Sequence, residues 1–263
     1  MLKFVCVKYT SLTTPPDGKI LNVYDHNDVN ALYDSIVANC SLPFEFYCLT
    51  EDSTSINSNV NIIPIDTTIG LDRVWWKMCI FDQSLWNSDD VVFYLDLDLK
   101  VYNNINSMCS APSANKLKTC RIGDQYESSF NSSLMLFNGH EMNHLYTDFI
   151  ADKQNILNVY TQANKGIDPY LTATYGRDSW LEAFNYPLDY HHRTTLTGDS
   201  DTDAAMLATD SDGNYLYRYR FRFQPVDSME VYFHPNSKII TCSGYHAKRD
   251  EPMADLALKI ASI

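Results

Sequence analysis

The segment at residues 91–95 (Val-Val-Phe-Tyr-Leu) would present apolar side chains on both faces of a β-strand. A strand of this kind is typical of a parallel sheet with helices covering both sides. The chain has 263 residues, 45% of them hydrophobic, which is enough to bury one sizeable core. We therefore predict an α/β fold with a mostly parallel central sheet flanked by helices.

The segments around this run alternate between strand and helix patterns, as α/β sheets require. Strands are predicted at residues 2–7, 44–50, 60–65, 133–137 and 215–223, and helices at 25–40, 75–85, 142–160 and 168–176. Asp25 or Asn27 would cap the first helix, and Asp168 the last, with Pro169 at its first position. No linker or repeat interrupts the order, so we expect a single compact domain over 1–263 with a mixed C-terminal half.

Composition excludes several classes of protein. The formal charge of −13 argues against DNA, RNA or anionic membrane as a partner, because like charges repel. The seven cysteines show no CxxC spacing, which argues against a zinc or redox dithiol site and favours a reducing compartment. No apolar run is long enough to span a bilayer or to form a signal peptide. The expected location is the cytoplasm.

Two aspartates follow the 91–95 run directly, at positions 96 and 98. In open α/β sheets, ligands bind at the carboxyl ends of the strands. At i and i+2 of an extended chain, the two side chains leave the same face roughly 6.6 Å apart along the strand. One divalent cation with its water shell can be reached by both carboxylates. This arrangement suits a metal-bound nucleoside diphosphate, whose departure as an anion the metal would assist.

The Asp96-Leu97-Asp98 segment resembles the DxD motif of glycosyltransferases with the GT-A (Rossmann-like) fold, and other segments follow in that family's order. Residues 131–138 (Asn-Ser-Ser-Leu-Met-Leu-Phe-Asn) are similar to the Asn-Ser-Gly-Val-Met-Leu-Phe-Asn segment of glycogenin-like (family 8) enzymes. Residues 73–77 (Arg-Val-Trp-Trp-Lys) resemble a Trp-Trp-x-Lys stretch of small, often virus-encoded relatives. Residues 242–248 stand where the family has Phe-His-Gly-x-Pro-Lys.

The resemblance implies a transferase that moves a sugar from a UDP-sugar, with Mn²⁺ or Mg²⁺ and with retention, to a glycan, small-molecule or protein acceptor. It implies a nucleotide-binding half at 1–100 and a sugar and acceptor half at 101–263, and the host cytoplasm if a virus encodes the chain. The implied metal ligands are Asp96, Asp98 and His246. The implied donor contacts are Val7, Tyr9, Thr10, Arg73, Lys77, Asp96, Asn131, Ser132, Ser133, Gly244 and Lys248. Asp168 and Asp189 are the candidate catalytic carboxylates.

The chain departs from the family pattern at three places. Ser243 stands where the metal-binding histidine is expected, so either a longer loop brings His246 to the metal or water replaces it. Ser133 replaces a glycine, and Pro169 follows Asp168 where the family has glutamine. Asp168 could orient a substrate or only cap its helix. Lys77 could bind phosphate or lie on an exposed helical face.

Three other functions share some of these sequence features. A haloacid-dehalogenase-like phosphohydrolase also has Asp-x-Asp after a strand, but Lys100 stands where that family has threonine or valine. A sugar nucleotidyltransferase needs a glycine-rich loop after its first strand, and residues 8–12 contain no glycine. A GT-A-fold binding protein that has lost catalysis is the third alternative, which the altered segment at 242–248 keeps open.

Overall fold

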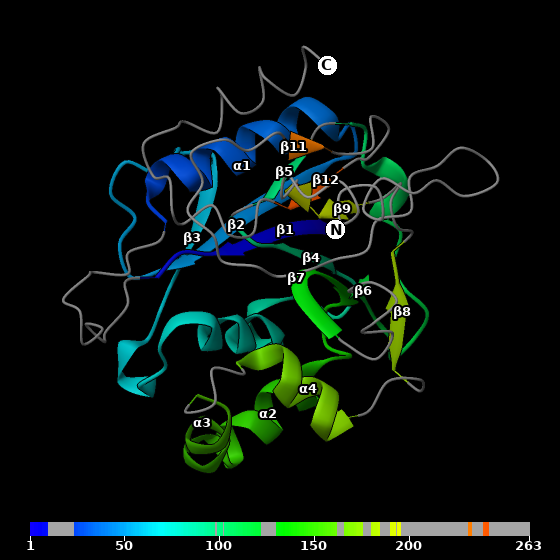
Figure 1. The fold of residues 1–263 in the computed structure, drawn as a ribbon. Helices are drawn as coiled ribbons and strands as arrows, with labels where there is room; N and C mark the ends of the chain where they lie inside the picture. The colour runs from blue at the N-terminus through cyan, green and yellow to red at the C-terminus, as the bar shows by residue number, and fades with distance from the viewer. Residues whose placement is uncertain are drawn as a thin grey trace.

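The computed structural model describes residues 1–9, 24–97, 99–101, 103–121, 130–161, 166–175, 180–184, 190–192, 194–195, 231–232 and 239–241. Within these residues, one seven-stranded sheet forms the centre of the molecule, in the order β3-β2-β1-β4-β7-β6-β8 (Figure 1). Its strands are β1 (Leu2–Val7), β2 (Phe44–Thr50), β3 (Val60–Pro64), β4 (Val91–Leu95), β6 (Leu117–Arg121), β7 (Phe130–Asn138) and β8 (Leu181–Ala183).

The sheet is mostly parallel, as predicted, and β7 is the one described strand of opposite direction. β3, β2, β1 and β4 are mutually parallel, whereas β7 runs antiparallel to both β4 and β6, and β8 is parallel to β6. The carboxyl end of β4 therefore lies beside the first residues of β7. A three-stranded sheet contains β5 (Leu99–Val101), β12 (Ile239–Thr241) and β9 (Tyr190–His192), and β10 (Thr194–Thr195) pairs with β11 (Val231–Tyr232).

Helices cover both faces of the central sheet, as the buried run at 91–95 predicts. The helix α1 (His26–Asn39) lies on one side, and α2 (Asn143–Ala151), α3 (Lys153–Thr161) and α4 (Ile167–Tyr175) lie together on the other (Figure 1). Along β4, Phe93 and Leu95 join the core under α1, while Val92 and Tyr94 join the core under α2 and α4. All four are fully buried or nearly so.

The first helix forms as its sequence predicts. Asp25 is the N-cap: its Oδ1 accepts a hydrogen bond from the Asn27 amide at 2.7 Å, and the Asp28 carboxylate accepts one from the Asp25 amide at 2.8 Å. This reciprocal capping box satisfies amide groups that have no partner within the helix. Strands 2–7, 44–50 and 91–95 are confirmed at their predicted bounds.

Other helices differ from the prediction. The segment 75–85 forms two 3₁₀-helices, η2 (Arg73–Phe81) and η3 (Gln83–Leu85), instead of one α-helix. Six of the nine residues of η2 are buried, so the surrounding core contacts it on nearly every side. The segment 142–160 is divided into α2 and α3 at Asp152. Two short 3₁₀-turns, η1 (Thr67–Ile69) and η4 (Asn106–Met108), complete the described helices.

The last predicted helix is present, but its cap was assigned wrongly. α4 begins at Ile167, so Asp168 lies in its first turn and the Asp168 carboxylate accepts a hydrogen bond from another element, as described below. The predicted stop at Gly176 and the predicted strand at 215–223 lie outside the described residues. Among the helices that are described, none combines the length and the apolar character needed to cross a bilayer.

Candidate functional site

Four elements contribute side chains to one polar cluster beside the carboxyl end of β4. The Lys77 ammonium, from η2, lies 2.7 Å from Oδ1 and 2.8 Å from Oδ2 of Asp96, which follows β4. The same ammonium lies 3.3 Å from Ser132 Oγ in β7. The Ser132 amide donates a hydrogen bond of 3.2 Å to Asp168 Oδ1 in α4. Residues far apart in the sequence are therefore linked in one chain of polar contacts.

The ion pair at the centre of this cluster is partly buried. The side chains of Lys77 and Asp96 are 10% and 17% exposed. A charge at such depth is costly unless a partner offsets its lost hydration, and here each charge has its partner at hydrogen-bond distance. Lys77 therefore does not lie on an exposed helical face, which was the alternative to a binding role.

Tyr94 contacts both members of the ion pair. Its hydroxyl donates a hydrogen bond to Asp96 Oδ1, and Lys77 Nζ lies 5.6 Å from the centre of its ring. Burial raises the pKa of Tyr94 well above its ordinary value, and the negative charge of Asp96 raises this pKa further. The phenol therefore stays protonated and remains a donor to Asp96.

Asp168 has a perturbed carboxyl group. Burial raises its pKa, while the Lys77 ammonium and the hydrogen bonds from Ser132 act in the opposite direction. The negative charge of Asp96 adds to the increase. A carboxyl group whose pKa is raised beside a lysine and a second carboxylate has the character of a functional site rather than of a solvated helix end.

An irregularity in β7 brings Ser132 into the cluster. Cys120 in β6 pairs with Asn131, but the preceding Thr119 pairs with Met135, so residues 132–134 have no partner in β6. The same residues stay with β4: Leu134 pairs with Leu95, and the Asp96 amide donates a 3.0 Å hydrogen bond to Ser133 O. The residues of β7 that are unpaired with β6 therefore remain hydrogen-bonded beside β4 as far as Asp96.

The other predicted donor contacts are distributed around this cluster or away from it. Val7 is buried at the end of β1, and Tyr9 packs against the core on the α4 side. Asn131 Oδ1 accepts a hydrogen bond of 3.0 Å from the Ser133 amide, which fixes the turn in β7. Arg73 begins η2 with φ of 52°, and its Nε lies 3.8 Å from Asp72 Oδ2.

Six predicted site residues cannot be placed. Thr10, Asp98, Asp189, Gly244, His246 and Lys248 lie outside the described residues. Among the residues that are described, no cluster of three His, Cys, Asp or Glu side chains could hold a metal ion. Asp96 is nevertheless suitable as one ligand. A carboxylate offers about four lone-pair directions, and Lys77 and Tyr94 account for three contacts to it.

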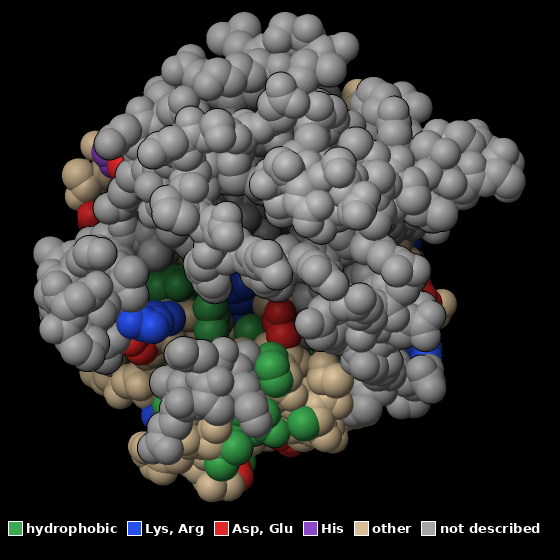
Figure 2. All heavy atoms as spheres, viewed as in Figure 1, with side chains coloured by type: hydrophobic (Ala, Val, Ile, Leu, Met, Phe, Trp, Pro, Cys, Tyr) green, Lys and Arg blue, Asp and Glu red, His purple; other side chains and the backbone are tan. Residues whose placement is uncertain are grey.

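Two contributors were missed by the sequence interpretation. Tyr94 stands two residues before Asp96, so a strand places both on one face, and this spacing was a usable signal. Thr119 is buried in β6, and its hydroxyl donates to the backbone of β7 at Asn131 and Leu134. This contact depends on the pairing of β6 with β7, for which the sequence offers no local signal. In the space-filling view, basic and acidic side chains lie beside hydrophobic ones near the middle of the molecule, between segments drawn in grey (Figure 2).

Comparison with known proteins shows similarity at the level of the fold. No family model matches the chain, and no curated protein matches it. A crystal structure of the galactosyltransferase LgtC in complex with donor and acceptor sugar analogues superimposes with a TM-score of 0.59 at 11% identity, over 99% of this chain and 96% of that one. An active-site mutant of LgtC matches with a TM-score of 0.56 at 11% identity, over 99% and 95% of the two chains.

A shorter match is found to the glycosyltransferase GlyE of Streptococcus pneumoniae, with a TM-score of 0.49 at 14% identity. It covers 70% of this chain, which spans about half of the GlyE chain (46%). The full-length matches to LgtC show that the chain has the GT-A (Rossmann-like) α/β fold, as the sequence resemblance implied.

Proposed function

We propose that this chain is a metal-dependent glycosyltransferase that moves a sugar from a UDP-sugar to an acceptor, with retention at the anomeric carbon. The observation that carries the proposal is the Lys77–Asp96–Ser132–Asp168 cluster at the carboxyl end of β4, directly before Asp98. The fold adds support, because full-length matches include a transferase bound to donor and acceptor sugar analogues. Residues 1–100 would hold the nucleotide, and residues 101–263 the sugar and acceptor.

In this proposal, Asp96, Asp98 and His246 hold Mn²⁺ or Mg²⁺, both of which prefer carboxylate oxygens. The cation supplies charge neutralisation for the leaving diphosphate. Lys77 is held close to Asp96, so its ammonium adds a second positive charge at the same place. Lys248 and Gly244 would approach the diphosphate from the C-terminal part of the chain.

The other side of the cluster would meet the sugar. Ser132 and Asp168 belong to elements in the second half of the chain, and the Ser132 amide fixes one oxygen of the Asp168 carboxylate. The remaining oxygen would accept a sugar hydroxyl group, which orients the anomeric carbon toward the acceptor. Asp189 is the second carboxylate proposed for the acceptor side.

The test is calorimetric titration of UDP into the protein, with and without Mn²⁺, for the wild type and Asp98→Ala. The proposal expects binding that needs the metal and disappears in the variant. Tyr47→Phe serves as the control, because the Tyr47 hydroxyl contacts Lys3 and Glu45 rather than the proposed site and should leave binding unchanged. No UDP binding under any of these conditions would contradict the UDP-sugar assignment.

A second measurement separates an enzyme from a binding protein that has lost catalysis. A panel of UDP-sugars is incubated with the protein and Mn²⁺, and released UDP is measured with and without simple sugar acceptors. Release from one UDP-sugar identifies the donor, and NMR of the product reports whether the anomeric configuration is retained. Tight binding of UDP-sugars without any release would support the binding protein instead.

A further inference from the structure

A buried hydroxyl group of β6 bridges two carbonyl groups of β7 where the pairing of these strands is irregular. Thr119 Oγ1 lies 2.6 Å from Asn131 O and 2.9 Å from Leu134 O, the carbonyl groups on either side of Ser132 and Ser133. A hydroxyl carries one hydrogen, which these two acceptors share or exchange. Thr119 is 2% exposed, so water cannot easily replace this contact.

The residues enclosed by this contact make three polar contacts of the candidate site. The Ser132 amide donates to Asp168, and the Ser132 hydroxyl lies within hydrogen-bond distance of Lys77. The Ser133 carbonyl accepts a hydrogen bond from the Asp96 amide. Strand irregularities of this kind redirect side chains and are frequent beside active sites. Residues 132–133 therefore connect Lys77, Asp96 and Asp168 through hydrogen bonds.

We propose that Thr119 is a positioning residue for the donor sugar. Its hydroxyl holds residues 132–134 in the conformation in which Ser132 aligns the Asp168 carboxylate and the Lys77 ammonium. Thr119 touches neither of these two side chains and acts through the backbone of β7. This inference rests on the proposed function, since it assigns to that function a residue buried one strand away from the cluster.

Thr119→Val is the informative change, because valine has nearly the same shape and lacks the hydroxyl. Asn131 O and Leu134 O would then face a methyl group, and residues 132–134 would relax. Ser132 lies on the sugar side of the cluster, so we expect kcat for UDP release from the UDP-sugar to fall about tenfold or more. The affinity for UDP alone should fall less than kcat, because the ion pair between Lys77 and Asp96 involves no residue of β6 or β7.

Thr119→Ser keeps the hydroxyl and should restore most of kcat. A merely structural role would give a different pattern, in which the valine variant loses thermal stability and UDP affinity together while kcat of the folded fraction stays normal. That pattern would overturn the proposal. So would a serine variant as impaired as the valine variant, because the hydroxyl would then not be the group that matters.

Hydrogen exchange of the Ser132 amide, followed by NMR, tests the same contact without any substrate. The amide should exchange faster in Thr119→Val than in the wild type and Thr119→Ser, because its hydrogen bond to Asp168 is weakened. Unchanged exchange in the valine variant would overturn the proposal even if activity fell. A wild type without donor turnover would instead remove the proposed function, and the exchange of Ser132 would still decide the role of Thr119 in β7.

Discussion

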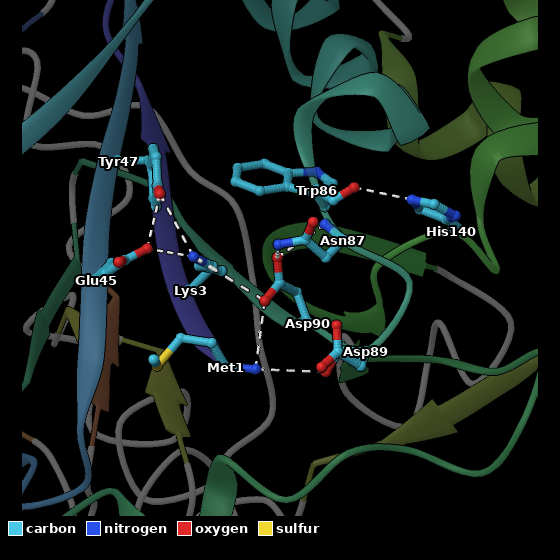
Figure 3. A network of polar contacts seen from close by, with 9 residues as sticks. All are labelled: Met1, Lys3, Glu45, Tyr47, Trp86, Asn87, Asp89, Asp90 and His140. Carbon is cyan, nitrogen blue, oxygen red and sulfur yellow. Dashed lines mark hydrogen bonds and ion pairs between the residues drawn. The ribbon is translucent and has the colours of Figure 1, made fainter.

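Two clusters of similar composition lie toward opposite ends of the parallel strands, called here the carboxyl edge and the amino edge, although Tyr94 and Tyr47 both pair with Val5 of β1. Each cluster joins a lysine, a tyrosine and carboxylates. At the carboxyl edge, Lys77 binds Asp96 and lies over the ring of Tyr94. At the amino edge, Lys3 forms an ion pair with Glu45 and lies 5.3 Å from the ring centre of Tyr47 (Figure 3). In both clusters the tyrosine hydroxyl donates to the carboxylate.

The amino-edge cluster contains a second, buried carboxylate besides the partly exposed Glu45. Asp90 is 2% exposed, and its carboxylate accepts a 2.9 Å hydrogen bond from the Asn87 amide and lies 3.3 Å from the Met1 amino group (Figure 3). Burial lowers the pKa of Lys3, but the hydrogen bonds with Glu45 and Tyr47 outweigh it and the pKa rises. The charged form of Lys3 is therefore favoured by folding, and this cluster stabilises the start of the sheet.

The carboxyl-edge cluster has the same chemical groups in a different setting. Asp96 follows β4, which lies beside the antiparallel strand β7, and its side chain is 17% exposed. Its neighbours include residues of a 3₁₀-helix, an irregular strand and the first turn of an α-helix, whereas Lys3, Glu45 and Tyr47 belong to the adjacent parallel strands β1 and β2. The comparison teaches that composition does not distinguish a stabilising cluster from the cluster for which we propose binding. Position at the carboxyl end of a strand does so.

Lys77→Met should have the largest effect, because it removes the positive charge at the point where the diphosphate would leave. We expect kcat/KM for the UDP-sugar to fall about 100- to 1000-fold, as when a preorganised electrostatic contact is removed from an active site. Steady-state UDP release measures it. A loss below threefold would show that the two lysine clusters do not differ in function.

Lys3→Met is the matching change at the amino edge, and its effect should appear in stability alone. Removing the lysine leaves Asp90 buried with fewer positive partners, at a cost of about 3 kcal/mol in the free energy of unfolding. Urea denaturation measures it, and kcat/KM of the folded variant should stay at the wild-type level. Reduced turnover without lost stability would contradict the separation of the two clusters.

Tyr94→Phe removes the hydrogen bond that orients Asp96 and should lower kcat/KM about tenfold, as expected for a neutral donor to a charged acceptor. The phenylalanine keeps the ring beside Lys77, so the fold should persist. The same substitution at Tyr47 should leave kcat/KM unchanged and lower the free energy of unfolding by about 1 kcal/mol. Equal effects of Tyr94→Phe and Tyr47→Phe on kcat/KM would show that the two clusters do not differ in function.

Asp168→Asn should change stability in a pH-dependent manner, and this change in stability is the smallest of the effects expected here. Because burial raises the pKa of Asp168, the folded chain holds this proton more tightly than the unfolded chain. The wild type therefore loses stability as the pH rises from the ordinary pKa of an aspartate to the raised one. Asparagine has no such titration, so the variant should be relatively more stable above that window and not below it. Thermal unfolding across this pH range measures the difference in stability between the wild type and the variant. If the pKa of Asp168 were not raised, this difference would not depend on pH.

The strands and the first helix could be predicted because their signals are local. Alternating or continuous apolar runs define β1, β2 and β4, and Asp25 with Asp28 marks the start of α1. The 3₁₀ form of η2 could not be predicted, because burial on nearly every side of Arg73–Phe81 leaves no helical face to recognise. There the packing of the completed core decides the helix type.

The candidate site was predictable in its members and not in their contacts. Lys77, Asp96, Ser132 and Asp168 could each be named from motifs, but the sequence does not tell that Lys77 binds Asp96 or that Asp168 accepts from Ser132. These contacts depend on how β4, β7 and α4 meet. Thr119 was missed for the same reason, since a threonine within a strand is ordinary until its partner strand is known.

The 3₁₀ form of η2 makes the position of Lys77 sensitive to substitutions elsewhere in that helix. A 3₁₀-helix turns about 120° per residue and an α-helix about 100°, so conversion of the first turn of η2 would rotate Lys77 relative to Arg73 by about 80°. The ammonium would then leave Asp96 although no residue of the cluster had changed. Substitutions of buried residues of η2, such as Trp75 or Met78, could therefore separate Lys77 from Asp96 by changing the helix type alone.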